Sequence, residues 1–312
     1  MRDTTPIAVA SRSFSRHPIL REELQRRYSD VRFNDEGLAL QGEALVAFAR
    51  GRRKLITALE RVDEDFLAAL PELEVVSKYG VGTDTLDLPA MLRHGVRLGW
   101  TGGVNRRAVA ELALAFMIAL LREVPQAVCE LRDGTWKNRQ GRQLSERVVG
   151  IVGCGNIGKD LAVILRMLDC TVLANDILDF PDFYATHGVE PVSLEELLRR
   201  SDVTTLHVPL DDSTRDLLSA ERLALMRTGA VLINTARGGL VDETTLKEML
   251  LDGRLAGAGF DVFAVEPPDL ELLRLPNFLG TPHIGGSSEE AVLAMGRAAI
   301  RGLDENHLPS TD

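Results

Sequence analysis

A glycine-rich segment near the middle of the chain is the feature that most limits how this protein can fold. Residues 149–158 read Val-Gly-Ile-Val-Gly-Cys-Gly-Asn-Ile-Gly, so an apolar run leads directly into the pattern G-x-G-x-x-G. Apolar residues then recur at helical spacing as far as Leu168, and a second apolar run ends at Asn175-Asp176. This order predicts a strand, a tight turn, a helix, a second strand and an acidic residue, which together are typical of a dinucleotide-binding unit.

Each glycine of the segment has its own physical task in such a unit. Gly153 allows the tight turn, Gly155 lets the backbone approach a pyrophosphate, and Gly158 lets the helix pack closely on the strand. The helix that opens at Asn156 and Ile157 offers unpaired N–H groups and a positive dipole end to the phosphates. The alternative is a glycine-rich turn in an α/β domain that binds no ligand.

The acidic residue that ends the second strand indicates which dinucleotide is bound. Asp176 lies 18 residues after Gly158 and can accept hydrogen bonds from the hydroxyls of an adenosine ribose. No Arg or Lys occurs between Asn175 and Ala185, so a 2′-phosphate would face a carboxylate without a compensating cation in this segment. The sequence therefore predicts NAD, and not NADP, as the cofactor.

Charge and composition exclude several classes of partner. The formal net charge of −10 argues against binding to nucleic acid or to an anionic membrane, since both require basic patches. The N-terminus lacks the basic-then-apolar pattern of a signal peptide. The nearly apolar run Ala108–Leu121 contains Glu111 and is too short to span a bilayer, so we expect a buried helix or an interface there.

The cysteines point to a reducing environment. Cys129, Cys154 and Cys170 are odd in number and show no metal-ligand or C-x-x-C spacing. We expect three free thiols in a cytoplasmic protein, and we expect no metal site.

Strand and helix signals alternate over the first hundred residues and again after the glycine segment. Such alternation predicts the α/β class, with doubly wound parallel sheets covered by helices. Because the glycine segment opens a nucleotide domain in mid-chain, we expect two Rossmann-like domains with a cleft between them. The predicted crossings lie near Trp100-Thr101 and Ile284-Gly285. They divide the chain into a discontinuous substrate-binding domain, 1–99 plus 286–312, and an NAD-binding domain, 100–285.

Three further segments carry polar residues at predicted strand ends. Arg237 follows the strand 230–234 on a turn rich in small residues, and its guanidinium suits a carboxylate; the alternative is a surface salt bridge. Asp261 lies near the end of the strand 256–262, and Glu266 follows that strand directly before two prolines that stiffen the turn. His283 stands between a proline and a glycine pair, unlike a histidine of an apolar core. Together they indicate an acid/base histidine that a carboxylate orients.

In these segments the chain resembles the D-isomer-specific 2-hydroxyacid dehydrogenases, in the phosphoglycerate-dehydrogenase-like branch without a C-terminal regulatory domain. The resemblance covers most of the chain and rests on four motifs in order: the glycine fingerprint, Asn-Thr-Ala-Arg-Gly, Asp-Val-Phe-x-x-Glu-Pro and Thr-Pro-His-Ile-Gly-Gly. It implies that Arg237 binds the substrate carboxylate, that His283 transfers the proton and that Glu266 is the partner of His283. It also implies that Asp261 holds the nicotinamide carboxamide. The further cofactor contacts that it implies are Val208, Pro209, Thr235, Ala236, His283 and Gly285.

The resemblance places a substrate loop in the first domain and implies a homodimer. The loop is Lys78-Tyr79-Gly80-Val81-Gly82, in which backbone N–H groups and a basic residue would face the substrate. Lys78 beside the two glycines suggests a second anionic group on the substrate; the alternative is that Lys78 ends the strand and points to water.

The sequence thus predicts an NAD-dependent oxidoreductase that interconverts a D-2-hydroxy acid and its 2-oxo acid. Two alternatives stay open: a formate- or phosphite-type dehydrogenase on the same scaffold, and a non-catalytic protein that senses NAD(H). The sequence leaves open the physiological substrate, the favoured direction and the roles of Arg106 and Arg107.

Overall fold

The computed structural model describes residues 2–310 and divides into two compact units. One unit contains residues 2–105 and 289–310, and the other contains Arg106–Ser288. The sequence placed the two crossings after residues 99 and 285, whereas the units divide after residues 105 and 288.

The first unit is built on a five-stranded parallel sheet in the order β2-β1-β3-β4-β5. Its strands are β1 (Ile7–Val9), β2 (Val31–Phe33), β3 (Lys54–Thr57), β4 (Val75–Lys78) and β5 (Arg97–Gly99). Its helices are α1 (Arg12–Arg16), α2 (Pro18–Arg27), α3 (Gly42–Ala49), α4 (Glu64–Ala68), α5 (Leu88–Arg93) and α14 (Glu289–Gly302).

The last helix, α14, packs on the sheet of the first unit although it follows the whole second unit in sequence. Ala299 and Ile300 share a buried cluster with Ile7 and Phe14. Gly302 lies against β5, where a β-carbon on Gly99 would fall 2.2 Å from the carbonyl oxygen of Gly302. The helix and the strand therefore approach closely because both positions lack a side chain.

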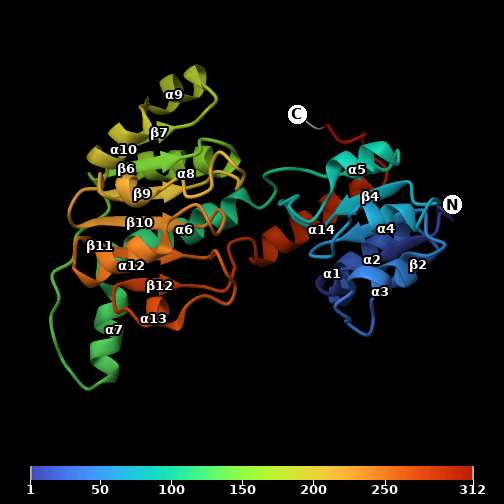
Figure 1. Ribbon diagram of the computed structural model, residues 1–312, viewed down its shortest axis with the longest axis horizontal. Helices are drawn as coiled ribbons and strands as arrows, with labels where there is room; N and C mark the ends of the chain where they lie inside the picture. Colours follow the sequence, from blue (N-terminus) through green and yellow to red (C-terminus); the bar gives the residue numbers. More distant parts are fainter. Residues whose placement is uncertain (1, 311–312) are drawn as a thin grey trace. The chain divides into compact units, whose positions relative to one another are not determined.

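The second unit contains a seven-stranded parallel sheet in the order β12-β11-β10-β9-β6-β7-β8 (Figure 1). Its strands are β6 (Val148–Val152), β7 (Thr171–Asn175), β8 (Val189–Pro191), β9 (Val203–Leu206), β10 (Ala230–Asn234), β11 (Leu255–Phe260) and β12 (Phe278–Gly280). Its helices are α6 (Arg106–Leu121), α7 (Val124–Arg132), α8 (Asn156–Met167), α9 (Pro181–His187), α10 (Leu194–Arg200), α11 (Ala220–Leu223), α12 (Glu243–Leu251) and α13 (Leu270–Leu273). The predicted α/β class with parallel sheets is confirmed in both units.

The strand order of the second unit explains where a ligand can bind. Strand β6 pairs with β7 on one side and with β9 on the other, so the chain reverses its direction of winding at β6. Loops leave the carboxyl ends of two such strands in opposite directions and open a crevice there, which is where open α/β sheets bind ligands. The glycine-rich segment follows β6 directly.

Helix α6 is the core helix of this unit and not an exposed apolar segment. Its buried residues include Val109, Phe116 and Leu120, and it packs on α8 and on the strands β10 and β11. Within residues 2–310, no single helix is long and apolar enough to cross a membrane. Helices α6 and α7 together have the length and the composition, but they are bent by 63° relative to each other.

Candidate functional site

The glycine-rich turn after β6 has the close contacts that its glycines predict. Gly153 adopts a positive φ of 95°, and a β-carbon there would fall 2.6 Å from the carbonyl oxygen of His207. A β-carbon on Gly158 would fall 2.1 Å from the carbonyl oxygen of Gly153. Gly155 differs, because a β-carbon there would have no protein atom within 4 Å. Gly153 and Gly158 are thus required by packing, while Gly155 borders open space at the start of α8.

Asp176, just beyond the end of β7, is tied to this turn. One carboxylate oxygen accepts a hydrogen bond from the N–H of Cys154 at 2.6 Å, and the other accepts one from the N–H of Leu178 at 2.9 Å. A carboxylate offers about four lone-pair sites, so both oxygens keep capacity for the hydroxyls of a ribose. The pKa of the Cys154 thiol is raised to about 11 by burial, so this thiol stays protonated at neutral pH.

Two buried polar atoms at neighbouring strand ends have no hydrogen-bond partner within the described part of the chain. They are Nδ1 of His207, just after β9, and Oγ1 of Thr235, just after β10. The other ring nitrogen of His207 lies 2.9 Å from the hydroxyl of Thr205, and burial lowers the pKa of the ring to about 3. A buried polar atom without a partner costs free energy, so such atoms indicate a place for a polar ligand.

These features fit a dinucleotide. The open space at Gly155, the N-terminus of α8 and the carboxylate of Asp176 would hold the pyrophosphate and the adenosine ribose. Val208, Pro209, Thr235 and Ala236 follow β9 and β10 at the same edge of the sheet, as the predicted cofactor contacts should.

Arg237 is carried by a turn that Asn234 shapes. The side-chain oxygen of Asn234 accepts a hydrogen bond from the N–H of Ala236 at 3.1 Å, and its amide donates to the carbonyl oxygen of Arg237 at 2.8 Å. Asn234 is buried at the end of β10, so the turn is fixed to a rigid strand. The Arg237 guanidinium donates to the carbonyl oxygen of Ala236 at 2.7 Å and is partly exposed.

Asp261, which directly follows β11, uses its carboxylate to hold the loop that carries His283. One oxygen accepts hydrogen bonds from the hydroxyl of Thr281 at 2.6 Å and from the N–H of Ile284 at 2.7 Å. The other accepts one from the N–H of Gly285 at 2.7 Å. Asp261 is almost completely buried. Its place in the structure thus adds a local task to the one that the resemblance implies, the binding of a carboxamide.

The side chain of His283 faces that of Glu266, which lies on the turn after β11. Its Nδ1 atom lies 3.7 Å from Oε1 of Glu266, which is an ion-pair distance when the ring is protonated. Both side chains stay accessible, with 57% of His283 and 48% of Glu266 exposed. His283 adopts a φ of 55°, in the left-handed region that residues other than glycine rarely occupy. Its N–H donates to the carbonyl oxygen of Asp261 at 2.9 Å, which helps to hold that conformation.

The candidate substrate loop lies in the first unit, at the carboxyl end of β4. The ammonium of Lys78 donates hydrogen bonds to the carbonyl oxygen of Ala58 and to the hydroxyl of Thr85, the latter at 2.7 Å. Lys78 is only 5% exposed, so the alternative that it points to water is wrong. Strand pairing and burial of the aliphatic stem draw the ammonium inward, where the two acceptors satisfy it.

The neighbours of Lys78 divide between core and loop. Tyr79 donates its N–H to the carbonyl oxygen of Thr57 at 2.8 Å, and its ring packs edge-on against Phe14. Both groups are therefore already engaged inside the unit, which leaves residues 80–82 as the accessible part of the loop. The indole of Trp100 donates to the carbonyl oxygen of Val81 at 2.9 Å.

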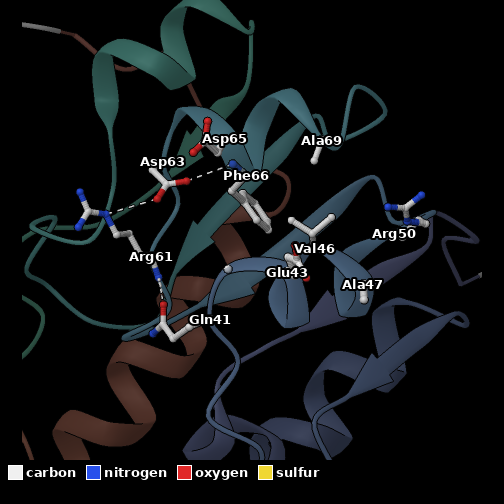
Figure 2. A pocket seen from close by; sticks show the side chains of 11 residues that line it. Gln41, Glu43, Val46, Ala47, Arg50, Arg61, Asp63, Asp65, Phe66 and Ala69 are labelled. Carbon is white, nitrogen blue, oxygen red and sulfur yellow. Dashed lines mark hydrogen bonds and ion pairs between the residues drawn. The ribbon is translucent and has the colours of Figure 1, made fainter.

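A groove of about 660 Å³ in the first unit contains none of the predicted site residues (Figure 2). It lies between α3 and α4, with Val46 and Phe66 among its lining residues. The carboxylate of Asp63 caps α4 by accepting from the N–H of Phe66, and it also pairs with Arg61 at 3.5 Å. Helix capping thus explains the presence of the Asp63 carboxylate in this groove.

Sequence reasoning missed three groups that shape the site. Asn234 and Thr281 stand inside the predicted motifs, but their hydrogen bonds depend on how the turns fold. Lys159 places its ammonium 3.4 Å from the ring centroid of Phe180, so a cation from α8 reaches the segment after β7. The helical periodicity of α8 could have placed Lys159 in its first turn, but not against that ring.

Comparison with known proteins agrees with this geometry. Residues 114–285 match the family described as "D-isomer specific 2-hydroxyacid dehydrogenase, NAD binding domain". The hydroxypyruvate reductase of Thermotoga maritima is 35% identical over 252 residues, which cover 78% of this chain and 80% of that protein. The D-3-phosphoglycerate dehydrogenase of Methanocaldococcus jannaschii is 37% identical over 240 residues, which cover 76% of this chain and 46% of that protein. The chain thus spans about half the length of the D-3-phosphoglycerate dehydrogenases that it matches.

Solved structures show the same fold over nearly the whole chain. A protein of Polaromonas sp. JS6 66, described as a D-isomer-specific 2-hydroxyacid dehydrogenase, superposes with a TM-score of 0.88 at 28% identity. The match covers 97% of this chain and 96% of that one.

Proposed function

The chain belongs to the family of D-isomer-specific 2-hydroxyacid dehydrogenases, and we propose that it interconverts a D-2-hydroxy acid and its 2-oxo acid. Its cofactor is NAD, since residues 114–285 match the NAD-binding domain of that family. The observation that carries the proposal is the pair formed by His283 and Glu266, with Arg237 at the same edge of the same sheet.

Each side chain of the pair has a defined task in this reaction. When bound, NAD(H) supplies the hydride that moves to or from C2 of the substrate. His283 gives a proton to the carbonyl oxygen in the direction of reduction and takes it back in the direction of oxidation. Glu266, 3.7 Å from Nδ1, favours the protonated ring and orients it.

Arg237 serves the substrate carboxylate. A guanidinium presents a planar fork of N–H donors that matches the two oxygens of a carboxylate. The Asn234 side chain fixes the turn of Arg237 from both sides, through Ala236 and through the carbonyl of Arg237 itself. This turn is therefore rigid enough to orient C2 of a 2-oxo acid.

A spectrophotometric assay of NADH oxidation tests the proposal. The protein is supplied with a panel that contains pyruvate, glyoxylate, hydroxypyruvate, 3-phosphohydroxypyruvate and oxaloacetate. We expect turnover of at least one 2-oxo acid, with the D-hydroxy acid as the product by chiral chromatography. NAD reduction with formate or phosphite, without activity on the panel, would identify the rival dehydrogenase. NADH binding without any turnover would indicate a sensor.

We also propose that the protein acts as a cytoplasmic homodimer. Val124, Val128 and Leu131 form an exposed apolar face on α7, and Trp136 in the following loop is 90% exposed. Contiguous exposed apolar side chains are typical of an interface. The three free cysteines support a reducing compartment. Sedimentation equilibrium of the wild type and of Leu131→Glu tests the dimer, and a monomeric wild type would refute it; cell fractionation tests the location.

A further inference from the structure

A carboxylate outside the predicted site holds the loop that carries Glu266. Glu243, the first residue of α12, accepts a hydrogen bond through Oε1 from the N–H of Ala264 at 2.8 Å. The two residues are 21 positions apart, and Ala264 stands two residues before Glu266. Glu243 is partly buried, and burial raises the pKa of its carboxyl.

Glu266 and Glu243 bind successive backbone N–H groups of one turn. The N–H of Phe263 donates to Oε1 of Glu266 at 3.3 Å, and the next N–H, that of Ala264, donates to Glu243. Glu266 belongs to the turn itself, whereas Glu243 belongs to helix α12, so the hydrogen bond to Glu243 ties the N–H of Ala264 to a separate element.

Two further contacts hold the turn at Phe263, the residue before Ala264. The ring of Phe263 packs near the rings of Phe260 and Phe278, with centroid distances of 6.3 Å and 6.2 Å. A β-carbon on Gly238 would fall 1.8 Å from the carbonyl oxygen of Phe263, so the turn of Arg237 also presses on this residue. The side chains of residues 264–266 are exposed. The hydrogen bond from the N–H of Ala264 to Glu243 is therefore the last of these contacts before Glu266.

We propose that Glu243 is a positioning residue that sets the place of Glu266 against His283. This inference rests on the proposed function, because it concerns the acid/base pair of that reaction. Without the acceptor on Glu243, the turn 263–266 relaxes and the carboxylate of Glu266 leaves its position 3.7 Å from Nδ1 of His283. The protonated form of the ring then loses the charge that favours it.

The test compares Glu243→Ala with Glu243→Gln, which keeps a side-chain oxygen as the acceptor. The matched control is Glu221→Ala, which removes a first-turn glutamate from the neighbouring helix α11, where the side chain bonds only to Ser219 among the contacts described. We expect hydrogen–deuterium exchange in residues 262–268 to accelerate in Glu243→Ala alone. We expect kcat to fall by roughly tenfold, within the range for residues coupled through one network, with little change in KM for NADH.

A double-variant cycle separates positioning from a general effect on folding. In a Glu266→Gln background, Glu243→Ala should change kcat by less than about twofold, because the group that it positions has lost its charge. An equal loss in both backgrounds would overturn the inference. So would unchanged exchange in residues 262–268, whatever the activity. Wild-type turnover in Glu266→Gln alone would instead refute the role of Glu266 in the proposed function.

Discussion

Gly158 on helix α8 touches the backbone of Gly153, the first glycine of the fingerprint. A β-carbon on Gly158 would fall 2.1 Å from the carbonyl oxygen of Gly153, closer than real side chains come to backbone. Gly155 is the N-cap of the same helix, and a β-carbon there would meet nothing within 4 Å. The two glycines are three residues apart but have different roles: Gly158 is required by the packing of the protein, and Gly155 leaves space for the ligand.

This difference predicts that replacement by alanine impairs stability at Gly158 and cofactor binding at Gly155. Gly158→Ala should lower the thermal stability of the second unit, because the backbone of the turn must move away from the new methyl group. Gly155→Ala should leave stability nearly unchanged and should weaken NADH binding, because the methyl group occupies the space that a pyrophosphate needs. Differential scanning calorimetry and NADH fluorescence titration measure the two effects. Loss of stability in Gly155→Ala with normal binding would contradict this assignment.

The preference for NADH over NADPH should depend on Asp176. Replacement by alanine removes the carboxylate that a 2′-phosphate would face, so the ratio of kcat/KM for the two cofactors should narrow. The turn also loses the hydrogen bond between Asp176 and the N–H of Cys154, so binding of both cofactors should weaken. Asp179→Ala, at an exposed position nearby, is the control and should keep the wild-type ratio. Equal efficiency of both cofactors in the wild type would refute the role.

The acid/base pair and the arginine should separate kinetically. His283→Ala should lower turnover by roughly 10²–10⁴-fold, the usual range for a positioned acid or base. Glu266→Gln should lower turnover less than His283→Ala does, while Arg237→Ala should damage both KM for the 2-oxo acid and kcat. Near-normal turnover in His283→Ala would end the proposed mechanism.

Lys78 should support its loop more than it selects a substrate. Its ammonium is buried between Ala58 and Thr85, so Lys78→Ala leaves these acceptors unsatisfied and loosens the loop for every substrate. We expect similar losses of kcat/KM for 3-phosphohydroxypyruvate and for glyoxylate. A loss confined to the dianion would instead support direct pairing between Lys78 and a second anionic group.

His207 should make the second unit less stable in acid. Burial lowers the pKa of its ring to about 3, whereas an exposed histidine titrates near 6.5, so the unfolded chain binds a proton first. The stability that the neutral ring contributes is present above pH 6.5 and is lost as pH falls from about 6.5 toward 3, by up to about 1.4 kcal/mol per pH unit. Denaturant unfolding followed by circular dichroism should show that His207→Gln flattens this dependence. His307→Gln, at an exposed position, is the control and should not flatten it.

Elements whose information is local could be predicted from the sequence. Helix α2 spans Pro18–Arg27, where a proline at its start and helix-forming residues after it suffice to indicate a helix. Asp63 stands directly before α4 and caps it through its hydrogen bond to the N–H of Phe66. Strand β2 could not be predicted in this way, because its three residues carry too short a pattern and depend on pairing with β1.

The sequence by itself determined the features that depend only on the type of a residue and on the residues next to it. A glycine permits a positive φ at any position, and an aspartate after a strand offers a carboxylate at the edge of the sheet. A histidine between a proline and a glycine pair is unlike a histidine of an apolar core. These properties identified the glycine fingerprint and the candidates Asp176, Arg237 and His283. The tertiary structure determined the features that depend on contacts between residues far apart in the sequence. It buried Lys78 against Ala58 and gave the carboxylate of Asp261 to the loop of His283. It also brought Glu243 to Ala264 across 21 residues. Such contacts follow from strand order and loop packing, which no local pattern of residues encodes.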